Sequence, residues 1–189
     1  MKKILNRAIS VLLIFVISAA LGFAASFTWD KIERNEFPLK YVEYVDEASE
    51  TFGVPKRIIY AIIKCESDFD ATAKSSAGAI GLMQIMPSTF EDISRRLGDN
   101  YENGMMYDPR TNIRYGTYYL SYLFKLFEDW ELVFAAYNAG LSNVYSWLED
   151  PEKLDDEGRL VKIPFPETAK YVDRVNDTQK KYIDLYGEL

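Results

Sequence analysis

The most constraining feature of the sequence is an apolar run, Ile58 to Cys65, that ends directly in a carboxylate, Glu66. Apolar side chains on nearly every face are typical of a helix buried on most of its surface, so the rest of the chain is expected to pack around it. A helix C-terminus disfavours negative charge, and apolar surroundings disfavour ionisation. Both effects raise the pKa of Glu66, and a raised pKa suits a general acid near neutral pH.

The segment after Glu66 is rich in Ser, Ala and Gly and closes with Gly-Leu-Met-Gln-Ile-Met-Pro at residues 81–87. Gly78 and Gly81 permit backbone angles closed to other residues and let a ligand approach the main chain, which suits a loop that lines a cleft. The alternative is a helix whose last turn ends in a solvated Glu, followed by an ordinary loop. Most Glu residues are surface charges, so a lone Glu would favour this alternative.

The boundaries between apolar patterns fall at residues that begin or end helices. Gly53 ends one helical pattern, and Pro55, Pro109 and Pro166 open three others. A strand signal is nearly absent, since residues 160–164 could at most pair briefly. The sequence therefore predicts an all-α globular domain. Helices are expected at about 40–52, 55–66, 87–97, 108–127, 130–137 and 144–148, and from residue 166 onward.

The N-terminus has the pattern of a targeting segment, because Lys2, Lys3 and Arg7 precede an uncharged stretch from Ala8 to Trp29. A cleaved signal peptide would use small residues around 22–26. An uncleaved anchor needs about 20 apolar residues, which this stretch supplies, and it is the favoured interpretation. In both cases the rest of the chain is exported. The predicted division is 1–29 for a signal-anchor or signal peptide, 30–39 for a short tether and 40–189 for the globular domain.

The composition excludes several classes of site. The chain has no His and one Cys, so histidine triads, histidine metal sites, Cys-based zinc sites and an intramolecular disulfide are excluded. No metal and no cofactor are expected. The net charge of −7 becomes −10 once the three basic N-terminal residues are set aside. An acidic exported domain without a basic patch is not expected to bind nucleic acid.

Four short motifs occur in one order along the chain: Glu66-Ser67, residues 78–87, Ala-Tyr-Asn-Ala-Gly at 136–140 and Pro-Glu-Thr-Ala-Lys-Tyr-Val at 166–172. Each alone is weak, but in this order they make residues 40–187 resemble the catalytic domain of soluble lytic transglycosylases (SLT). The resemblance implies a lysozyme-like fold and peptidoglycan glycan strands as the partner. It also implies a site of action at the extracytoplasmic face of the bacterial membrane or in the cell wall. A monomer is assumed.

Glycosidic bond cleavage generally uses two carboxyl groups. Besides Glu66, the nearest candidates are Asp68 and Asp70, which lie in a polar loop where Asp70 could equally cap a turn. The resembled family is understood to work with a single Glu, which protonates the oxygen of the β-1,4 bond between N-acetylmuramic acid and N-acetylglucosamine. The same Glu then takes a proton from the C6 hydroxyl, which attacks the anomeric carbon and closes a 1,6-anhydro ring. Glu66 is therefore the expected catalytic residue.

The resemblance places Ser75, Gln84 and Met86 on the wall of a cleft beside the acid. Gln84 offers both an amide donor and an acceptor, which suit sugar hydroxyl and acetamido groups. The alternative for Met83 and Met86 is core filling, and the alternative for Ser75 is ordinary turn chemistry.

The two later motifs supply the remaining expected substrate contacts. Tyr137 and Asn138 put an aromatic face beside an amide at the Gly140 break; buried packing would explain Tyr137 but not Asn138. Tyr171 resembles the family tyrosine whose hydroxyl lies near the acid, and Glu167 resembles a ligand contact at the start of the last helix. An acidic residue in a first helical turn is also simply stabilising, which is the alternative for Glu167.

Two other functions compete with this interpretation. A goose-type lysozyme would use water in place of the C6 hydroxyl on the same fold, and the motifs of Tyr137 and Tyr171 together favour the transglycosylase over it. A membrane-tethered, non-catalytic wall-binding module would keep the fold without the activity. Glu66 is present, which argues against that module.

Overall fold

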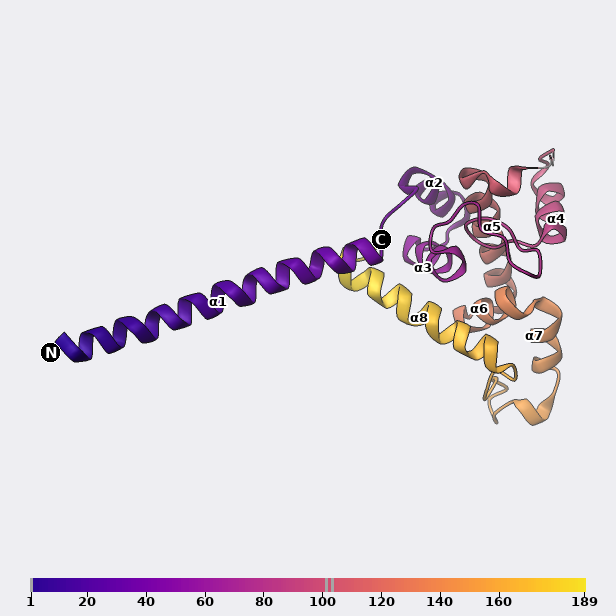
Figure 1. Ribbon diagram of the computed structural model, residues 1–189. Coiled ribbons are helices and arrows are strands. Elements are labelled where there is room, and N and C mark those ends of the chain that lie inside the picture. Colours follow the sequence, from indigo (N-terminus) through magenta and orange to yellow (C-terminus); the bar gives the residue numbers. More distant parts are fainter. Residues whose placement is uncertain (1, 101, 103) are drawn as a thin grey trace. The chain divides into compact units, whose positions relative to one another are not determined.

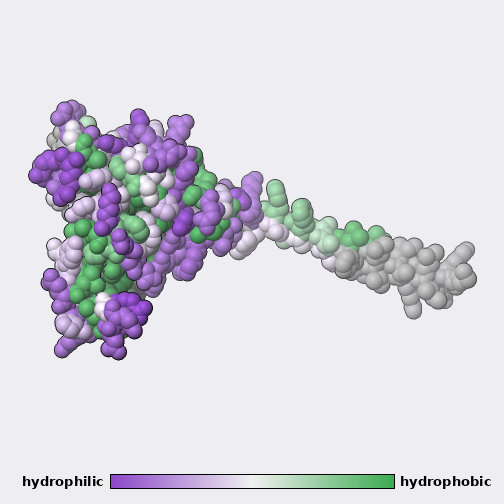
Figure 2. Space-filling view, turned by 180° about the vertical axis from the view of Figure 1, so that it is seen from behind, coloured by the Kyte–Doolittle hydropathy of each residue, from purple (hydrophilic) through white to green (hydrophobic). Residues whose placement is uncertain are grey.

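The computed structural model describes the chain in two compact units, Met1–Pro38 and Leu39–Leu189. It describes residues 2–100, 102 and 104–189, without the side chains of residues 2–12, 14, 15 and 24. The first unit is one helix, α1 (Lys2–Glu36) (Figure 1). Its described part exposes large apolar side chains, Phe23 and Phe27 among them, and Figure 2 shows hydrophobic surface along this part of the helix. Much of the expected targeting segment lies outside the described side chains. Among the residues that are described, no helix has both the length and the hydropathy needed to cross a membrane.

The second unit is built from helices, which confirms the predicted all-α class. The described residues form no strand there, only isolated bridges such as Ile80 with Ile85 and Leu154 with Leu160. The latter is the brief pairing that the sequence suggests. The helices are α2 (Val42–Phe52), α3 (Lys56–Ser67), α4 (Pro87–Leu97), α5 (Pro109–Phe127), α6 (Trp130–Ala139), α7 (Leu141–Leu148) and α8 (Pro166–Tyr186), with short 3₁₀ turns at Met105–Tyr107 and Pro151–Lys153.

The helix boundaries follow the local chemistry of the sequence. Asp108 caps α5 by accepting a hydrogen bond from the backbone N–H of Thr111 at 2.8 Å, and Pro109 takes the first helical position. Asp129 caps α6 through the N–H groups of Glu131 and Leu132. Each such cap satisfies a donor that the helix leaves unpaired.

Helix α3 is the buried centre of the domain, as its apolar run predicts. Every residue from Ile58 to Ile63 is at most 1% exposed. The helix packs against α8 and α2, and the ring of Tyr60 stacks on that of Tyr182 with centroids 5.4 Å apart. Burying such aliphatic side chains contributes roughly 1.5–3 kcal/mol each, so α3 holds the domain together while its last turn reaches a loop.

The long helix α5 connects the two sides of the domain. It contacts α2 and α4 on one side and α6 on the other, and α6 in turn contacts α7 and α8 (Figure 1). The loop that follows α3, residues 68–86, lies directly against the C-terminal part of α6, because the hydroxyl of Tyr137 donates to the carbonyl of Met83. This arrangement brings the four sequence motifs to one region.

Candidate active site

Glu66 is the next-to-last residue of α3 and is mostly buried. Burial raises the pKa of its carboxyl from 4.5 to about 7, although a hydrogen bond from Tyr171 and the charge of Arg174 act in the opposite direction. The raised pKa that the sequence predicts is therefore confirmed. A carboxyl with this pKa exchanges its proton near neutral pH, which is what a group that acts first as acid and then as base requires.

Tyr171 on α8 is the direct partner of this carboxyl. Its hydroxyl donates to Oε1 of Glu66 at 2.6 Å, and its side chain is 4% exposed. Burial, followed by the negative charge of Glu66, raises the pKa of Tyr171 well above its ordinary value, so the phenol stays protonated and remains a donor. The two residues lie 105 positions apart in the sequence.

The other two nearby carboxylates are engaged at the surface. Asp68 pairs with Lys64 at 2.6 Å. Asp70 accepts from both the backbone N–H and the hydroxyl of Thr72, at 2.8 and 2.7 Å, which lowers the pKa of Asp70. This is the turn-capping role that its sequence position suggests. Neither group shares the buried environment of Glu66.

The loop beside the acid contains a tight turn whose first position, Gly81, has room only for a glycine. Ile80 and Ile85 exchange two backbone hydrogen bonds of 3.1 Å around it. Gly81 has φ +82°, and a Cβ there would lie 2.3 Å from Nδ2 of Asn112. Asn112 is fully buried on α5 and donates to the carbonyls of Met106 and Ile80 at 2.7 and 3.1 Å, while it accepts from Met83 N–H at 2.8 Å.

Two further helices hold the same turn. The hydroxyl of Ser67, adjacent to Glu66, donates to the carbonyl of Leu82 at 2.8 Å. The hydroxyl of Tyr137 on α6 donates to the carbonyl of Met83 at 2.8 Å. The Met83 side chain itself is fully buried, as its core-filling alternative predicts. Helices α3, α5 and α6 thus position this turn relative to the acid.

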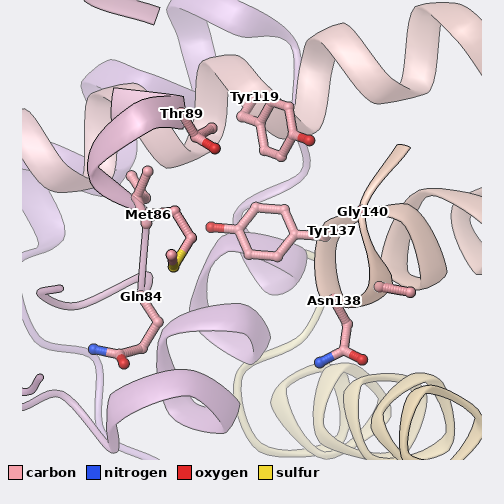
Figure 3. A pocket seen from close by; sticks show the side chains of 9 residues that line it. Gln84, Met86, Thr89, Tyr119, Tyr137, Asn138 and Gly140 are labelled. Atoms are coloured by element: carbon pink, nitrogen blue, oxygen red, sulfur yellow. The ribbon is translucent and has the colours of Figure 1, made fainter. Parts of the chain in front are cut away.

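A cavity of about 260 Å³ lies between this turn and the end of α6 (Figure 3). It brings together four residues that the sequence predicts as substrate contacts. It also includes Thr89 and Tyr119, which the sequence does not single out. The ring of Tyr119 lies 5.6 Å from that of Tyr137. The lining residues are Gln84, Ile85, Met86, Thr89, Tyr119, Tyr137, Asn138, Ala139 and Gly140.

The two amides in this cavity present opposite hydrogen-bonding groups. Both donors of Gln84 are used, because its Nε2 donates to the carbonyls of Ala73 and Gly81 at 3.2 and 2.9 Å. Gln84 therefore offers only its oxygen, and the expectation that it supplies both groups is wrong. Asn138 accepts from the buried hydroxyl of Thr168 at 2.8 Å, which leaves its amide nitrogen as the available group.

The remaining candidates lie outside the cavity lining. Ser75 accepts a hydrogen bond from Ala79 N–H at 2.9 Å in a tight turn, and Glu167 is exposed in the first turn of α8. Glu66 does not line the cavity directly. Burial, followed by the charge of Glu66, raises the pKa of Tyr137, which forms part of the cavity wall. Within the residues that the structure describes, no group of three or more His, Cys, Asp or Glu side chains could hold a metal ion.

Comparisons with known proteins agree with this geometry. A family model described as the Transglycosylase SLT domain matches residues 43–159. The soluble lytic murein transglycosylase of Escherichia coli (strain K12) is 36% identical over 151 residues, which cover 78% of this chain and 23% of that protein. Membrane-bound lytic murein transglycosylase C of Edwardsiella ictaluri is 30% identical over 171 residues, which cover 76% of this chain and 46% of that protein.

Solved structures show the same fold. The 70 kDa soluble lytic transglycosylase Slt70 of Escherichia coli superposes with a TM-score of 0.74 at 34% identity, covering 82% of this chain and 26% of that one. An inactive mutant of the lytic transglycosylase Slt from Pseudomonas aeruginosa gives a TM-score of 0.73 at 33% identity, with the same coverage. The chain thus spans about a quarter of the length of these soluble relatives. The predicted lysozyme-like class is confirmed.

Proposed function

Because this chain belongs to the transglycosylase SLT domain family, we propose that it is a peptidoglycan lytic transglycosylase with Glu66 as its only acid and base. The observation that carries the proposal is the buried Glu66 carboxyl, with a pKa near 7 and a hydrogen bond from Tyr171. Glu66 lies in the last turn of the most buried helix. Tyr137, whose pKa is raised by burial and by the charge of Glu66, lines a cavity that contains four expected substrate contacts.

The reaction begins with Glu66 in its protonated form. The carboxyl gives its proton to the oxygen of the β-1,4 bond, and that bond breaks as the N-acetylglucosamine side leaves as an alcohol. The resulting carboxylate takes the proton of the C6 hydroxyl on the N-acetylmuramic acid. The C6 oxygen bonds to the anomeric carbon and closes a 1,6-anhydro ring. Glu66 ends protonated, no water is consumed, and the protein is ready for another cycle.

This chemistry requires precise positioning more than a second catalytic group. The nucleophile belongs to the sugar that is cleaved, so its attack is intramolecular once the ring is held correctly. Gln84 and Asn138 would bind polar groups of the sugar, and Tyr137, Tyr119 and Met86 would supply the apolar surface of the same cavity. Ser75 and Glu167 stay proposed contacts for parts of the strand beyond this cavity.

We further propose that the domain acts outside the membrane. Soluble and membrane-bound lytic murein transglycosylases are both among its relatives. The uncharged N-terminal stretch behind three basic residues supports an export signal or an anchor. Cell fractionation combined with N-terminal sequencing separates the two: a mature N-terminus near Ala25 on protein free in the medium would exclude the anchor.

The product of the reaction tests the main proposal. Digestion of purified peptidoglycan should leave 1,6-anhydro-N-acetylmuramic acid ends, each lighter by one water than a hydrolysed end and resistant to borohydride because the reducing end is lost. Mass spectrometry distinguishes the alternatives. Reducible muramic ends as the main product would make the protein a goose-type lysozyme. Binding to peptidoglycan without any cleavage would make it a wall-binding module.

A further inference from the structure

Helix α8 carries a cation, Arg174, close to the hydrogen-bonded pair of Glu66 and Tyr171. Arg174 lies three residues after Tyr171, and its guanidinium carbon is 5.5 Å from the centre of the Tyr171 ring. This is the geometry of a cation–π contact, which is worth about 0.5–1 kcal/mol at an exposed site. Arg174 therefore contacts the residue whose hydroxyl is hydrogen-bonded to Glu66.

The charge of the same arginine also acts on helix α3 immediately before the acid. Burial raises the pKa of the Cys65 thiol, whereas Arg174 acts to lower that pKa, and the Cys65 Sγ lies 3.6 Å from the hydroxyl of Thr178 on α8. Arg174 thus contacts the ring of Tyr171, and its charge acts on Cys65, the residue before Glu66. Among the described residues, no carboxylate lies within ion-pair distance of Arg174, so its charge acts on this cluster without a counter-ion at contact.

We propose that Arg174 is a positioning residue, which holds the Tyr171 ring so that its hydroxyl stays directed at Glu66 and which sets the electrostatic field at the acid. The proposal rests on the proposed function, since it assigns Arg174 to the same reaction. The groups that face Glu66 are Cys65 on its own helix, Tyr171 and Arg174 on α8, and Tyr137 on α6. Arg174 is the one cation in this set.

The sign of the electrostatic effect follows from the charges. A nearby cation stabilises the ionised carboxyl, so Arg174 lowers the pKa of Glu66 against the larger effect of burial. Without Arg174 the pKa of Glu66 rises further. Because the reaction starts from protonated Glu66, the fall in activity on the alkaline side of the pH profile then moves to higher pH.

The test compares three variants on α8 by the pH dependence of kcat and kcat/KM. Arg174→Gln removes the positive charge and the planar guanidinium group. We expect kcat to fall about tenfold because the Tyr171 ring is then held less well. The alkaline limb of the pH profile of Arg174→Gln, where its activity falls with rising pH, should also move to higher pH. Arg174→Lys keeps a cation over the Tyr171 ring. It should return both kcat and the position of the alkaline limb most of the way to the wild-type values. Lys180→Gln removes one positive charge from an exposed site of the same helix and should change neither.

Each outcome decides the assignment. If Arg174→Gln loses activity with an unmoved limb, or if Lys180→Gln moves the limb equally, the positioning role is wrong. A limb that moves in Arg174→Gln and returns in Arg174→Lys supports it. Circular dichroism shows whether the variants are folded. Because wild-type digestion products are measured in the same assay, a failure of the proposed reaction appears as missing anhydro ends in every protein, independent of the comparison among variants.

Discussion

The hydroxyl of Tyr171 donates to Oε1 of Glu66 at 2.6 Å across the interface of α8 and α3. Two opposing influences meet at this bond. Burial favours the neutral carboxyl, whereas the hydrogen bond and the Arg174 charge favour the ionised one, and burial is the largest. The balance leaves the pKa of Glu66 at about 7. A group with this pKa can both donate and accept a proton near neutral pH.

Replacing Tyr171 by Phe should change the pH dependence of the activity. Tyr171→Phe removes the hydroxyl and keeps the ring, so the packing of α8 on α3 is preserved. Because the lost hydrogen bond stabilises the ionised carboxyl, the pKa of Glu66 rises and the alkaline limb of the activity profile moves to higher pH. A kcat profile against pH measures this. A limb that stays in place or moves to lower pH would contradict the assigned hydrogen bond.

Replacing Glu66 by Gln should remove activity while leaving the fold intact. Glu66→Gln keeps the shape and removes the titrating proton, so turnover should fall by a factor of about 10² to 10⁴ or more. Asp68→Asn and Asp70→Asn are the matched controls, because both carboxylates are occupied at the surface by Lys64 and Thr72. A folded Glu66→Gln protein with near wild-type release of anhydro ends would show that another group is the acid.

The raised pKa of Glu66 also predicts a pH-dependent cost in stability. The folded state binds the Glu66 proton more tightly than the unfolded state, whose carboxyl titrates near 4.5. Stability from the neutral carboxyl is therefore complete below about pH 4.5 and is lost as pH rises through about 7. Glu66→Gln does not titrate, so urea unfolding should find it more stable than wild type by at most about 3 kcal/mol at pH 8, and by little at pH 4. An equal difference at both pH values would exclude this linkage.

Much of the fold could be predicted from local chemistry. Gly53, Asp108 and Pro166 mark helix ends because their preferences are set by the backbone itself, and the structure agrees at each of them. The burial of α3 could be predicted because its apolar residues cover nearly the whole helix surface. Patterns within one segment carry this kind of information.

The supports of the site could not be predicted in the same way. Asn112 interrupts the apolar face of a helix, and nothing local shows that its amide binds a turn 29 residues earlier. Tyr119 has a helical spacing that is typical of core residues, and only the position of α6 turns its ring into a cavity wall. Thr168 lies within a recognised motif, yet its partner Asn138 is 30 residues away. These roles depend on how helices pack, which the spacing of residues does not specify.

Two glycines of the loop beside the acid test how tightly the turn is packed. Gly78 and Gly81 both have positive φ, at +94° and +82°, so Ala at either should cost about 1–2 kcal/mol. A Cβ at Gly78 meets nothing within 4 Å, whereas one at Gly81 meets Asn112 and the Met106 carbonyl. Gly81→Ala should therefore cost roughly 1–3 kcal/mol more than Gly78→Ala in urea unfolding. Equal losses would mean that Asn112 does not hold the turn closely.

Thr168 provides a test of how the substrate is bound. Its buried hydroxyl donates to the Asn138 oxygen at 2.8 Å, which leaves the amide nitrogen of Asn138 available. Gln84, whose nitrogen donates to two carbonyls, presents its oxygen; both amides are labelled in Figure 3. A sugar acetamido group carries one donor and one acceptor on opposite sides and matches this pair. Thr168→Val has nearly the same shape and lacks the hydroxyl, so Asn138 is no longer held in one orientation.

Losing this orientation should weaken substrate binding with little effect on the chemical step. One hydrogen bond is worth about 0.5–1.5 kcal/mol, so KM for a soluble glycan strand should rise about 2- to 12-fold in Thr168→Val, with kcat nearly unchanged. Thr168→Ser keeps the hydroxyl and is the matched control, and it should retain most of the wild-type KM. Steady-state kinetics on the three proteins decide the question. A Thr168→Ser protein as impaired as Thr168→Val would point to packing of the Thr168 methyl group against its neighbours, and an unchanged KM in Thr168→Val would show that the Asn138 amide does not contact the substrate.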